Sequence, residues 1–422
     1  MKLRVSPSRI RGEVAVPGSK SHTIRGLIAA LAADGESRLV APLYSADTLA
    51  VRRAAELLGM RVREDGRDWV CAGTGGNFCA PDGTRLDLAN SGTGLRFFAG
   101  MAATGGIRLE LDGDESLRTR IMAGLLDALT ALGAETSSRN GRCPVSVCGP
   151  LKGGRAKVDG STSQFISSLL FAAPRAQSDC AFDLDFLNEQ PYVRLTLQWL
   201  DRLGIRYTVS PDMLHYQVPA GQTYHGFTAV IPADFSTALF PLAAGMIAGD
   251  GVTIRNLDFG DVQGDKACFD FFRRMGAKIS DDGGFVAASG ALQSGEFDLN
   301  ATPDALPVMA AAAAVIPGET RLVNAPQARI KETDRIKCMT RELAKMGADV
   351  RELADGMVIH GGKLHGAEVD GCGDHRIVMA LAVAALAADS ETVITSAEAA
   401  AVTYPDFIRD FQNMGADFQT EE

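Results

Sequence analysis

Apolar residues recur with a helical spacing in several segments that begin with polar residues. In the first of these segments, Ile24, Leu27, Ile28 and Leu31 follow the i, i+3, i+4, i+7 pattern of one helical face. Alanine and glycine fill much of the rest, so such a helix can be buried on most sides. Similar segments begin, at intervals of 70 to 73 residues, near Lys20, Ser91, Ser161, Asp234, Asp304 and Asp374. The pattern predicts six buried helices with polar starts.

A second series has nearly the same period and marks helix ends. A helix-like segment is followed each time by Leu or Met, then by glycine, then by a strand-like run. The glycines lie 68 to 74 residues apart, at Gly59, Gly133, Gly204, Gly276, Gly347 and Gly415. Glycine is the usual residue after the last helical turn, because it adopts the left-handed conformation without strain. The two series predict a mixed α/β fold with six similar units, grouped as two lobes of three, and 221–230 is a candidate lobe boundary.

The longest apolar runs, Val308–Ile316 and Ile377–Ala388, are too short to cross a bilayer and predict buried helices. The first residues contain no apolar run typical of a signal peptide. The eight cysteines form no CxxC pair. We therefore expect a cytoplasmic protein with reduced thiols and no membrane partner.

Composition narrows the functional classes further. The 422 residues are 46% hydrophobic and 22% charged, which is typical of a globular chain with two or three domains. The net charge is −10 and aromatic residues make up 6%, which argues against a nucleic-acid partner. The six histidines show no HExxH spacing, so we expect no metal. A phosphate-binding GxxxxGK[ST] loop is absent, and Gly73–Gly76 opens no apolar helix, so no nucleotide cofactor is expected.

The polar helix starts carry the candidate chemistry. A helix N-terminus binds anions through its free N–H groups. Basic residues near the starts are Lys20, Arg25, Arg96, Arg120, Lys331, Arg335 and Arg376. Together with Asp304, Glu332 and His375 they form a general acid–base set beside an anion site. Taken one at a time, such residues are more often helix caps or solvated charges.

These residues lie in motifs that resemble the 5-enolpyruvylshikimate-3-phosphate synthases, a family of enolpyruvyl transferases. The resemblance spans nearly the whole chain and includes GSKSHTIRG, NSGTGLR, STSQFISSLLFAAP, PDALPV, RIKETDRIK and GDHRIVMA in the family's order. It implies an inside-out, barrel-like α/β fold with two globular domains of three repeats each. One domain would be discontinuous, with residues 1–13 and 228–422, and the other would contain residues 14–227, with the active site in the cleft between them.

The resemblance also implies a reaction and a set of residues. The 5-hydroxyl of shikimate 3-phosphate adds to phosphoenolpyruvate, and phosphate is then eliminated, without cofactor or metal. The resemblance gives catalytic roles to Asp304, Glu332, Lys20 and His375. It gives substrate contacts to Lys20, Ser21, Arg25, Asn90, Gly92, Arg120, Thr162, Ser163, Gln164, Asp304, Lys331, Arg335 and Arg376. We expect a monomer.

Four positions depart from the family pattern. Val402 stands where many members have lysine, Glu189 and Gln190 replace an expected serine, Ser116 replaces an early arginine, and Phe97 replaces proline. A related transferase acting on another phosphorylated acceptor therefore stays an alternative. A UDP-N-acetylglucosamine enolpyruvyl transferase is a second alternative, but no cysteine lies between Cys79 and Cys143, where its reactive cysteine belongs. An RNA 3′-phosphate cyclase or a non-catalytic binding protein explains the motifs less well.

Overall fold

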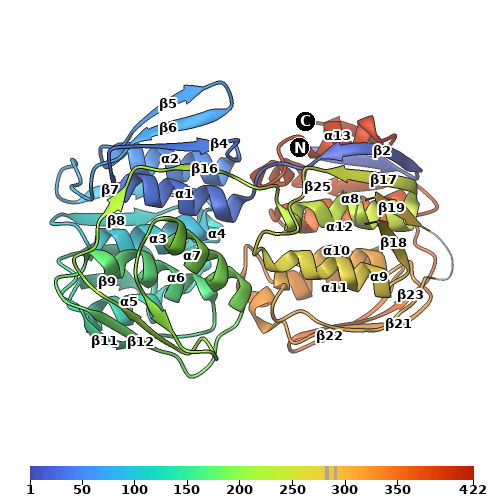
Figure 1. Cartoon of the computed structure of the whole chain (residues 1–422). Helices are drawn as coiled ribbons and strands as arrows, with labels where there is room; N and C mark the ends of the chain where they lie inside the picture. The colour runs from blue at the N-terminus through green and yellow to red at the C-terminus, as the bar shows by residue number, and fades with distance from the viewer. Residues whose placement is uncertain (281–284, 289–291) are drawn as a thin grey trace. The chain divides into compact units, whose positions relative to one another are not determined.

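The structure is a computed structural model that describes residues 1–280, 285–288 and 292–422 (Figure 1). The chain forms two compact units. Unit 1 consists of Met1–Pro17 and Pro232–Glu422, and unit 2 consists of Gly18–Ile231. The chain therefore passes from one unit to the other near Pro17 and returns near Ile231, a few residues after each boundary expected from the sequence.

Unit 2 contains three four-stranded sheets in the described part of the chain. The first has the order β16 (Thr228–Val230), β4 (Glu36–Val40), β6 (Asp68–Ala72), β5 (Arg61–Asp65). The second has the order β7 (Thr84–Asp87), β8 (Arg108–Asp112), β10 (Arg142–Cys148), β9 (Glu135–Arg139). The third has the order β11 (Gly154–Lys157), β12 (Cys180–Asp183), β14 (His215–Val218), β13 (Thr208–Val209). A short parallel pair joins β15 (Tyr224–His225) and β3 (Ala33–Asp34).

Unit 1 likewise contains three four-stranded sheets within the described residues. The first has the order β2 (Ile10–Ala15), β17 (Gly249–Arg255), β19 (Phe285–Ala288), β18 (Ala277–Ser280). The second has the order β20 (Glu296–Asp298), β21 (Gly318–Val323), β23 (Gly356–Gly361), β22 (Asp349–Leu353). The third has the order β24 (Glu368–Asp370), β25 (Thr392–Thr395), β1 (Lys2–Ser6), β26 (Asp417–Glu421).

All six sheets share one strand pattern. In each, the first two strands pair in parallel and the remaining two pairings are antiparallel. Each of these sheets is open, with two edge strands, so none closes into a barrel among the residues described. The chain is thus a mixed α/β protein, as expected, built from open sheets.

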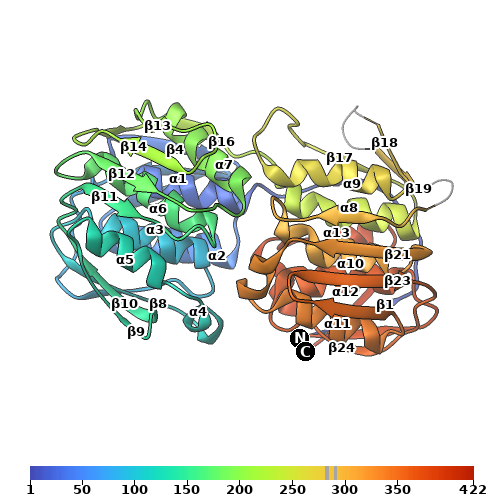
Figure 2. The same ribbon diagram turned by 90° about the horizontal axis from the view of Figure 1, so that it is seen from below.

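The six predicted apolar helices are present and buried. They are α1 (Lys20–Ala32), α3 (Gly92–Ala102), α6 (Ser163–Ala172), α8 (Phe235–Ala248), α10 (Leu306–Ala313) and α12 (His375–Leu386). All residues of α10 and α12 are buried, which fits the prediction from Val308–Ile316 and Ile377–Ala388. Figures 1 and 2 show α8, α10 and α12 side by side in the middle of unit 1, with strands on the outside.

Five of these helices begin at a capping side chain, and the sixth begins differently. The caps are Ser19, Ser91, Thr162, Asp234 and Asp374. The third helix thus begins slightly later than the expected Ser161, because the Thr162 side chain accepts a hydrogen bond from the backbone N–H of Gln164 and caps the helix. Asp304 lies in a 3₁₀ turn, Pro303–Ala305, just before α10. The N-cap of α10 is Ala305, so Asp304 does not cap this helix, and Pro307 lies in the first turn, where proline is tolerated.

Six other helices end as the glycine series predicts. These helices are α2 (Ala46–Leu57), α5 (Ala123–Ala131), α7 (Gln190–Arg202), α9 (Cys268–Arg274), α11 (Arg335–Lys345) and α13 (Phe407–Asn413). Each is followed by a Leu or Met cap and then by one of the six glycines, all with φ between 69° and 105°. This confirms the prediction of left-handed glycines at six helix ends. One further short helix, α4 (Glu115–Thr119), precedes α5.

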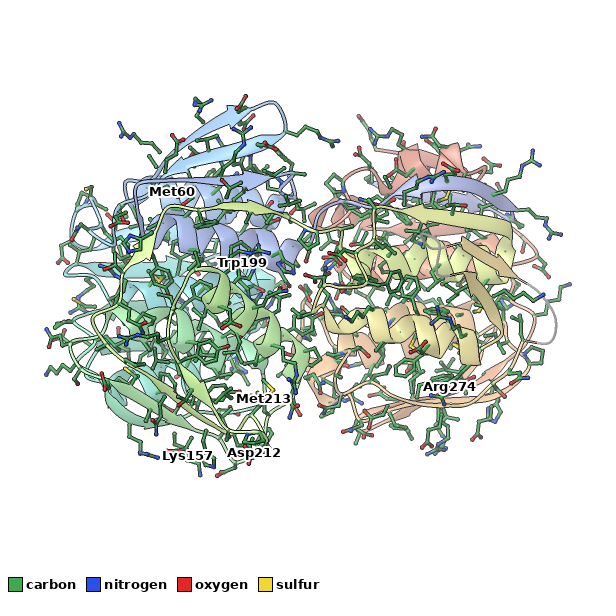
Figure 3. All side chains as sticks on the ribbon, in the orientation of Figure 1. Met60, Lys157, Trp199, Asp212, Met213 and Arg274 are labelled. Atoms are coloured by element: carbon green, nitrogen blue, oxygen red, sulfur yellow. The ribbon has the colours of Figure 1, made fainter. Side chains whose placement is uncertain are left out.

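A buried hydrogen bond joins two helices of unit 2. The Trp199 indole N–H on α7 donates to His22 Nδ1 on α1 at 3.1 Å. Figure 3 shows Trp199 among the helices, whereas Lys157 and Asp212 lie at the outer edge. The eight cysteines are all free. No helix in the described chain is long and apolar enough to cross a membrane.

The glycine caps give a stability prediction. Gly204 has φ 69°, and an added Cβ there would meet nothing within 4 Å, so only backbone strain opposes a side chain. We expect Gly204→Ala to lower the free energy of unfolding by about 1 kcal/mol, and Gly204→Asn to lower it less, because asparagine tolerates this conformation. Urea unfolding followed by circular dichroism measures both.

A matched control is available in the same unit. Gly106 also has open space around an added Cβ, but its φ is not left-handed. We expect Gly106→Ala to leave stability unchanged or raise it slightly. Equal losses for Gly106→Ala and Gly204→Ala would contradict the capping explanation.

Candidate active site

One buried guanidinium organises the polar residues of unit 1. Arg335 is the first residue of α11, and its side chain is 1% exposed. Its Nε donates to Asp374 Oδ2 at 2.7 Å, its NH1 to Asp304 Oδ1 at 2.9 Å and its NH2 to Glu332 Oε2 at 2.6 Å. The starts of α11 and α12 and the turn before α10 therefore meet at one side chain.

Asp304 has two further cationic neighbours. Arg376 NH2 lies 3.1 Å from Asp304 Oδ2, and Lys331 Nζ lies 3.6 Å from Asp304 Oδ1. With Asp374 and Glu332 the cluster holds three carboxylates against three permanent cations. Formal neutrality of this kind is what permits ionised groups to be buried. The Asp304 side chain is 17% exposed and so keeps limited access to solvent.

These neighbours shift the proton equilibria. Burial by itself would raise the pKa of the Asp304 carboxyl, but Arg376, Lys331 and Arg335 outweigh burial and hold that pKa well below its usual range. Burial also opposes the charge on Arg335, yet Asp374, Glu332 and Asp304 raise the pKa of the guanidinium. In this arrangement Asp304 is ionised and its basicity is suppressed by the cations around it.

Asp374 connects the cluster to the helix that follows it. As the N-cap of α12 it accepts the backbone N–H of Arg376 at 2.9 Å, while its carboxylate also receives the Arg335 guanidinium. His375 is buried, and its Nδ1 lies 3.6 Å from Asp374 Oδ1. One carboxylate thus fixes the α12 start and orients Arg335.

In unit 2 the start of α1 holds Lys20 and Arg25 in different environments. Lys20 Nζ lies 3.1 Å from the buried Asp47 Oδ2. Arg25 is 1% exposed and donates to Thr196 Oγ1 at 2.9 Å and to the carbonyls of Ser21 and Tyr192, each at 3.1 Å. Burial lowers the pKa of Arg25 to about 9. Arg25 therefore ties the first turns of α1 and α7 together, and its contact with a substrate stays a prediction.

The start of α3 collects two arginines. Arg120 donates to Asn90 Oδ1, and Arg96 donates to the carbonyl of Ile121 at 3.1 Å. Both guanidinium groups pack so closely on Gly92 that a Cβ there would collide with them. Glycine at this position is therefore required for the cations to approach the helix N-terminus, an arrangement suited to binding an anion.

The start of α6 carries the hydroxyl groups predicted to bind phosphate. Thr162 accepts from Gln164 N at 3.3 Å as the helix cap. Ser163 donates both its backbone N–H, at 3.2 Å, and its hydroxyl, at 2.8 Å, to the Glu189 carboxylate. Gln164 Oε1 is buried and has no hydrogen-bond partner among the described residues.

The structure groups the predicted residues by unit. Unit 1 brings Asp304, Lys331, Glu332, Arg335 and Arg376 into one connected cluster with His375 at its edge. Unit 2 holds Lys20, Ser21, Arg25, Asn90, Gly92, Arg120, Thr162, Ser163 and Gln164 at the starts of α1, α3 and α6. Joint action of Lys20 with Asp304 stays a prediction. No group of three or more metal-ligating side chains that could hold an ion occurs in the described residues.

Sequence reasoning missed three carboxylates that these clusters need. Asp374 was expected only as a helix start, Glu189 only as a departure from the family pattern, and Asp47 not at all. Each bonds a partner 26 to 39 residues away in the chain. One signal in the sequence pointed to Asp374: it stands at the start of an apolar segment, as Asp304 does 70 residues before it.

The fold and these clusters define a mixed α/β protein with charged and hydroxyl side chains gathered at its helix starts. A family model described as EPSP synthase (3-phosphoshikimate 1-carboxyvinyltransferase) matches residues 5–411. The chain belongs to the EPSP synthase family.

Individual relatives match this chain over nearly its whole length. The chain is 45% identical to a 3-phosphoshikimate 1-carboxyvinyltransferase of Acetivibrio thermocellus, with 100% of both chains covered. It is 42% identical to the enzyme of that name from Halobacterium salinarum, with 99% of both covered. A solved structure of EPSP synthase from Acinetobacter baumannii has a TM-score of 0.82 at 23% identity and covers 99% of this chain and 100% of that one. This last likeness shows a shared fold.

The Arg335 cluster gives a stability prediction. Arg335→Met leaves three carboxylates without their common cation, so we expect a loss of about 3–5 kcal/mol in the free energy of unfolding. The control is Arg321→Met in the same unit. Arg321 is 38% exposed and pairs with Glu296, and its loss should cost at most about 1 kcal/mol. Urea unfolding of both variants measures these free energies. Similar small losses of unfolding free energy in both would show that the cluster does not hold the three helix starts together.

Proposed function

We infer that this protein transfers the enolpyruvyl group of phosphoenolpyruvate to the 5-hydroxyl of shikimate 3-phosphate and releases phosphate, the shikimate-pathway step that leads to chorismate and the aromatic amino acids. The observation that carries this inference is the cluster in which Arg335 joins Asp304 and Glu332, in a chain of the EPSP synthase family. The reaction needs one group that accepts a proton and one that donates a proton beside bound polyanions, and this cluster offers both.

Asp304 accepts the proton of the 5-hydroxyl. In the structure, Arg376, Lys331 and Arg335 suppress its basicity. A bound phosphate or carboxylate group draws part of that positive charge to itself, and the pKa of Asp304 then rises toward the range where it can take a proton. Substrate binding therefore switches on the base.

Glu332 handles the proton at C3 of the enolpyruvyl group. Glu332 takes up a proton from solvent when the two polyanions bind beside it. As the 5-oxygen bonds to C2, Glu332 gives this proton to C3, which becomes a methyl group in a tetrahedral intermediate. In the second step C3 returns a proton to Glu332, the C2–oxygen bond to phosphate breaks, and phosphate leaves with the proton that Asp304 took from the 5-hydroxyl. Glu332 Oε2 accepts from Arg335 NH2 at 2.6 Å, which fixes the position of the carboxyl group.

Unit 2 supplies anion contacts in this proposal. Arg120, with Asn90 and Gly92 at the start of α3, and Lys20 at the start of α1 bind carboxylate or phosphate groups. Thr162, Ser163 and Gln164 bind the phosphate of shikimate 3-phosphate. Arg25 contributes by holding the Ser21 and Tyr192 backbone.

We propose that the six sheets with their helices are six copies of one β/α unit, three in unit 1 and three in unit 2. The shared strand pattern and the six glycine caps support this view. Both units contribute residues to the reaction, which the protein carries out as a monomer. Eight free cysteines favour a reducing compartment such as the cytoplasm. No specific observation favours UDP-N-acetylglucosamine as acceptor.

The activity is tested with purified protein. We expect phosphate release when phosphoenolpyruvate and shikimate 3-phosphate are both present, and none when either is omitted. Replacing shikimate 3-phosphate by UDP-N-acetylglucosamine should give no release. No release with the proposed pair, or equal release with the nucleotide sugar, would overturn the assignment.

The role of Asp304 is tested by Asp304→Asn, which preserves shape but removes the base. We expect kcat to fall by about 10²–10⁴-fold, with KM for both substrates changed much less. The matched control is Asp298→Asn in the same unit, where an exposed carboxylate binds Asn300 and Asn324. Turnover close to that of the unmodified protein in Asp304→Asn would remove Asp304 from the base role.

A further inference from the structure

The donors at the start of α6 are already occupied by a carboxylate of the chain itself. Glu189 Oε2 accepts the Ser163 backbone N–H at 3.2 Å, the Ser163 hydroxyl at 2.8 Å and the Thr162 hydroxyl at 3.5 Å. A helix N-terminus with adjacent hydroxyl groups is a site for an anion. In this structure the anion is the Glu189 side chain.

The contact is built into the fold. Glu189 is 1% exposed and has a left-handed backbone, with φ 57°, which costs free energy for a residue other than glycine. Next to it, Asn188 donates its backbone N–H to the Gly160 carbonyl at 3.0 Å and its side-chain amide to the Ser161 carbonyl at 3.4 Å. A Cβ on Gly160 would collide with the Phe186 carbonyl, so the two segments require glycine at their closest approach.

Two anions cannot share these donors. A carboxylate and a phosphate close to the same two hydroxyl groups would repel one another in a buried site, where charges are weakly screened. Ser163 has one hydroxyl proton and one backbone N–H, and Glu189 takes both. A phosphate group therefore reaches the α6 start only after the Glu189 side chain has left it.

We propose that Glu189 is an internal competitor for the anion site at the start of α6 and thereby weakens the binding of a phosphorylated acceptor there. This rests on the proposed function, in which the phosphate of shikimate 3-phosphate binds to Thr162, Ser163 and Gln164. A dianionic phosphate outcompetes a single carboxylate for these donors, but it binds more weakly than it would without the competitor. An acceptor that offers only a hydroxyl group there does not displace the carboxylate, so Glu189 has no effect on its affinity.

The test measures equilibrium binding of two ligands that differ in the phosphate group alone. Isothermal titration gives the dissociation constants of shikimate 3-phosphate and of shikimate for the whole protein and for Glu189→Gln. Removing the competing charge should tighten binding of shikimate 3-phosphate by about tenfold, the scale expected for hydrogen bonds to a charged group. Binding of shikimate should stay unchanged.

The control is Glu342→Gln, which neutralises another buried glutamate. Glu342 lies in unit 1, whereas α6 belongs to unit 2, and it accepts from Lys345 at 2.7 Å and from the Asp370 backbone N–H at 2.8 Å. We expect no change in either dissociation constant for this variant. A second variant, Glu189→Ser, has a side chain too short to reach the same donors and should also tighten binding of shikimate 3-phosphate, in case Glu189→Gln does not fold.

Two results overturn the inference. The first is binding of shikimate 3-phosphate that is unchanged or weaker in the folded Glu189 variants, which would mean that the carboxylate only supports the helix start. The second is equal tightening of both ligands, which would mean that Glu189 does not sense the phosphate group. The phosphate-release assay on the unmodified protein reports separately on the proposed function, so failure of one is distinguishable from failure of the other.

Discussion

The charged cluster of unit 1 depends on one constraint, the burial of the Arg335 guanidinium. A guanidinium taken out of water costs several kcal/mol, about the size of a small domain's whole stability, unless carboxylates surround it. Asp304, Glu332 and Asp374 supply them from positions 31, 3 and 39 residues away from Arg335 in the chain. Because one planar group reaches all three, the starts of α11 and α12 and the turn before α10 have to lie together.

The apolar part of the fold makes that arrangement possible. The buried helices α10 and α12 are rich in alanine, so they pack closely and bring their starts together without bulky side chains between them. Six other helices each stop at a left-handed glycine, and the chain turns back there. In the sequence, apolar segments with polar starts recur at intervals of about 70 residues, and the charged clusters lie near these starts.

Much of this could be predicted from local sequence, and the exceptions have a common cause. The glycine at each helix end and the small apolar residues of each buried helix act within a few residues, so their pattern is visible in the chain. The pairing of Glu189 with Ser163, and of Asp374 with Arg335, joins residues 26 and 39 positions apart. Such contacts depend on how helices pack.

The chain carries a net charge of −10, and two of its cations at the helix starts, Lys20 and Arg376, are paired with carboxylates of the chain. Arg25, Arg96 and Arg120 donate to hydroxyl, carbonyl or amide oxygens. In the proposed function, a substrate anion competes with internal carboxylates for these donors. At α6 the competitor is Glu189, so a phosphate group would have to displace a carboxylate there. At Asp304 a bound anion would share Arg376 and Lys331, and a carboxylate with less cationic charge around it is a stronger base. Under this proposal, binding and proton transfer are coupled through the same cations, so the base would gain strength when the substrate is in place.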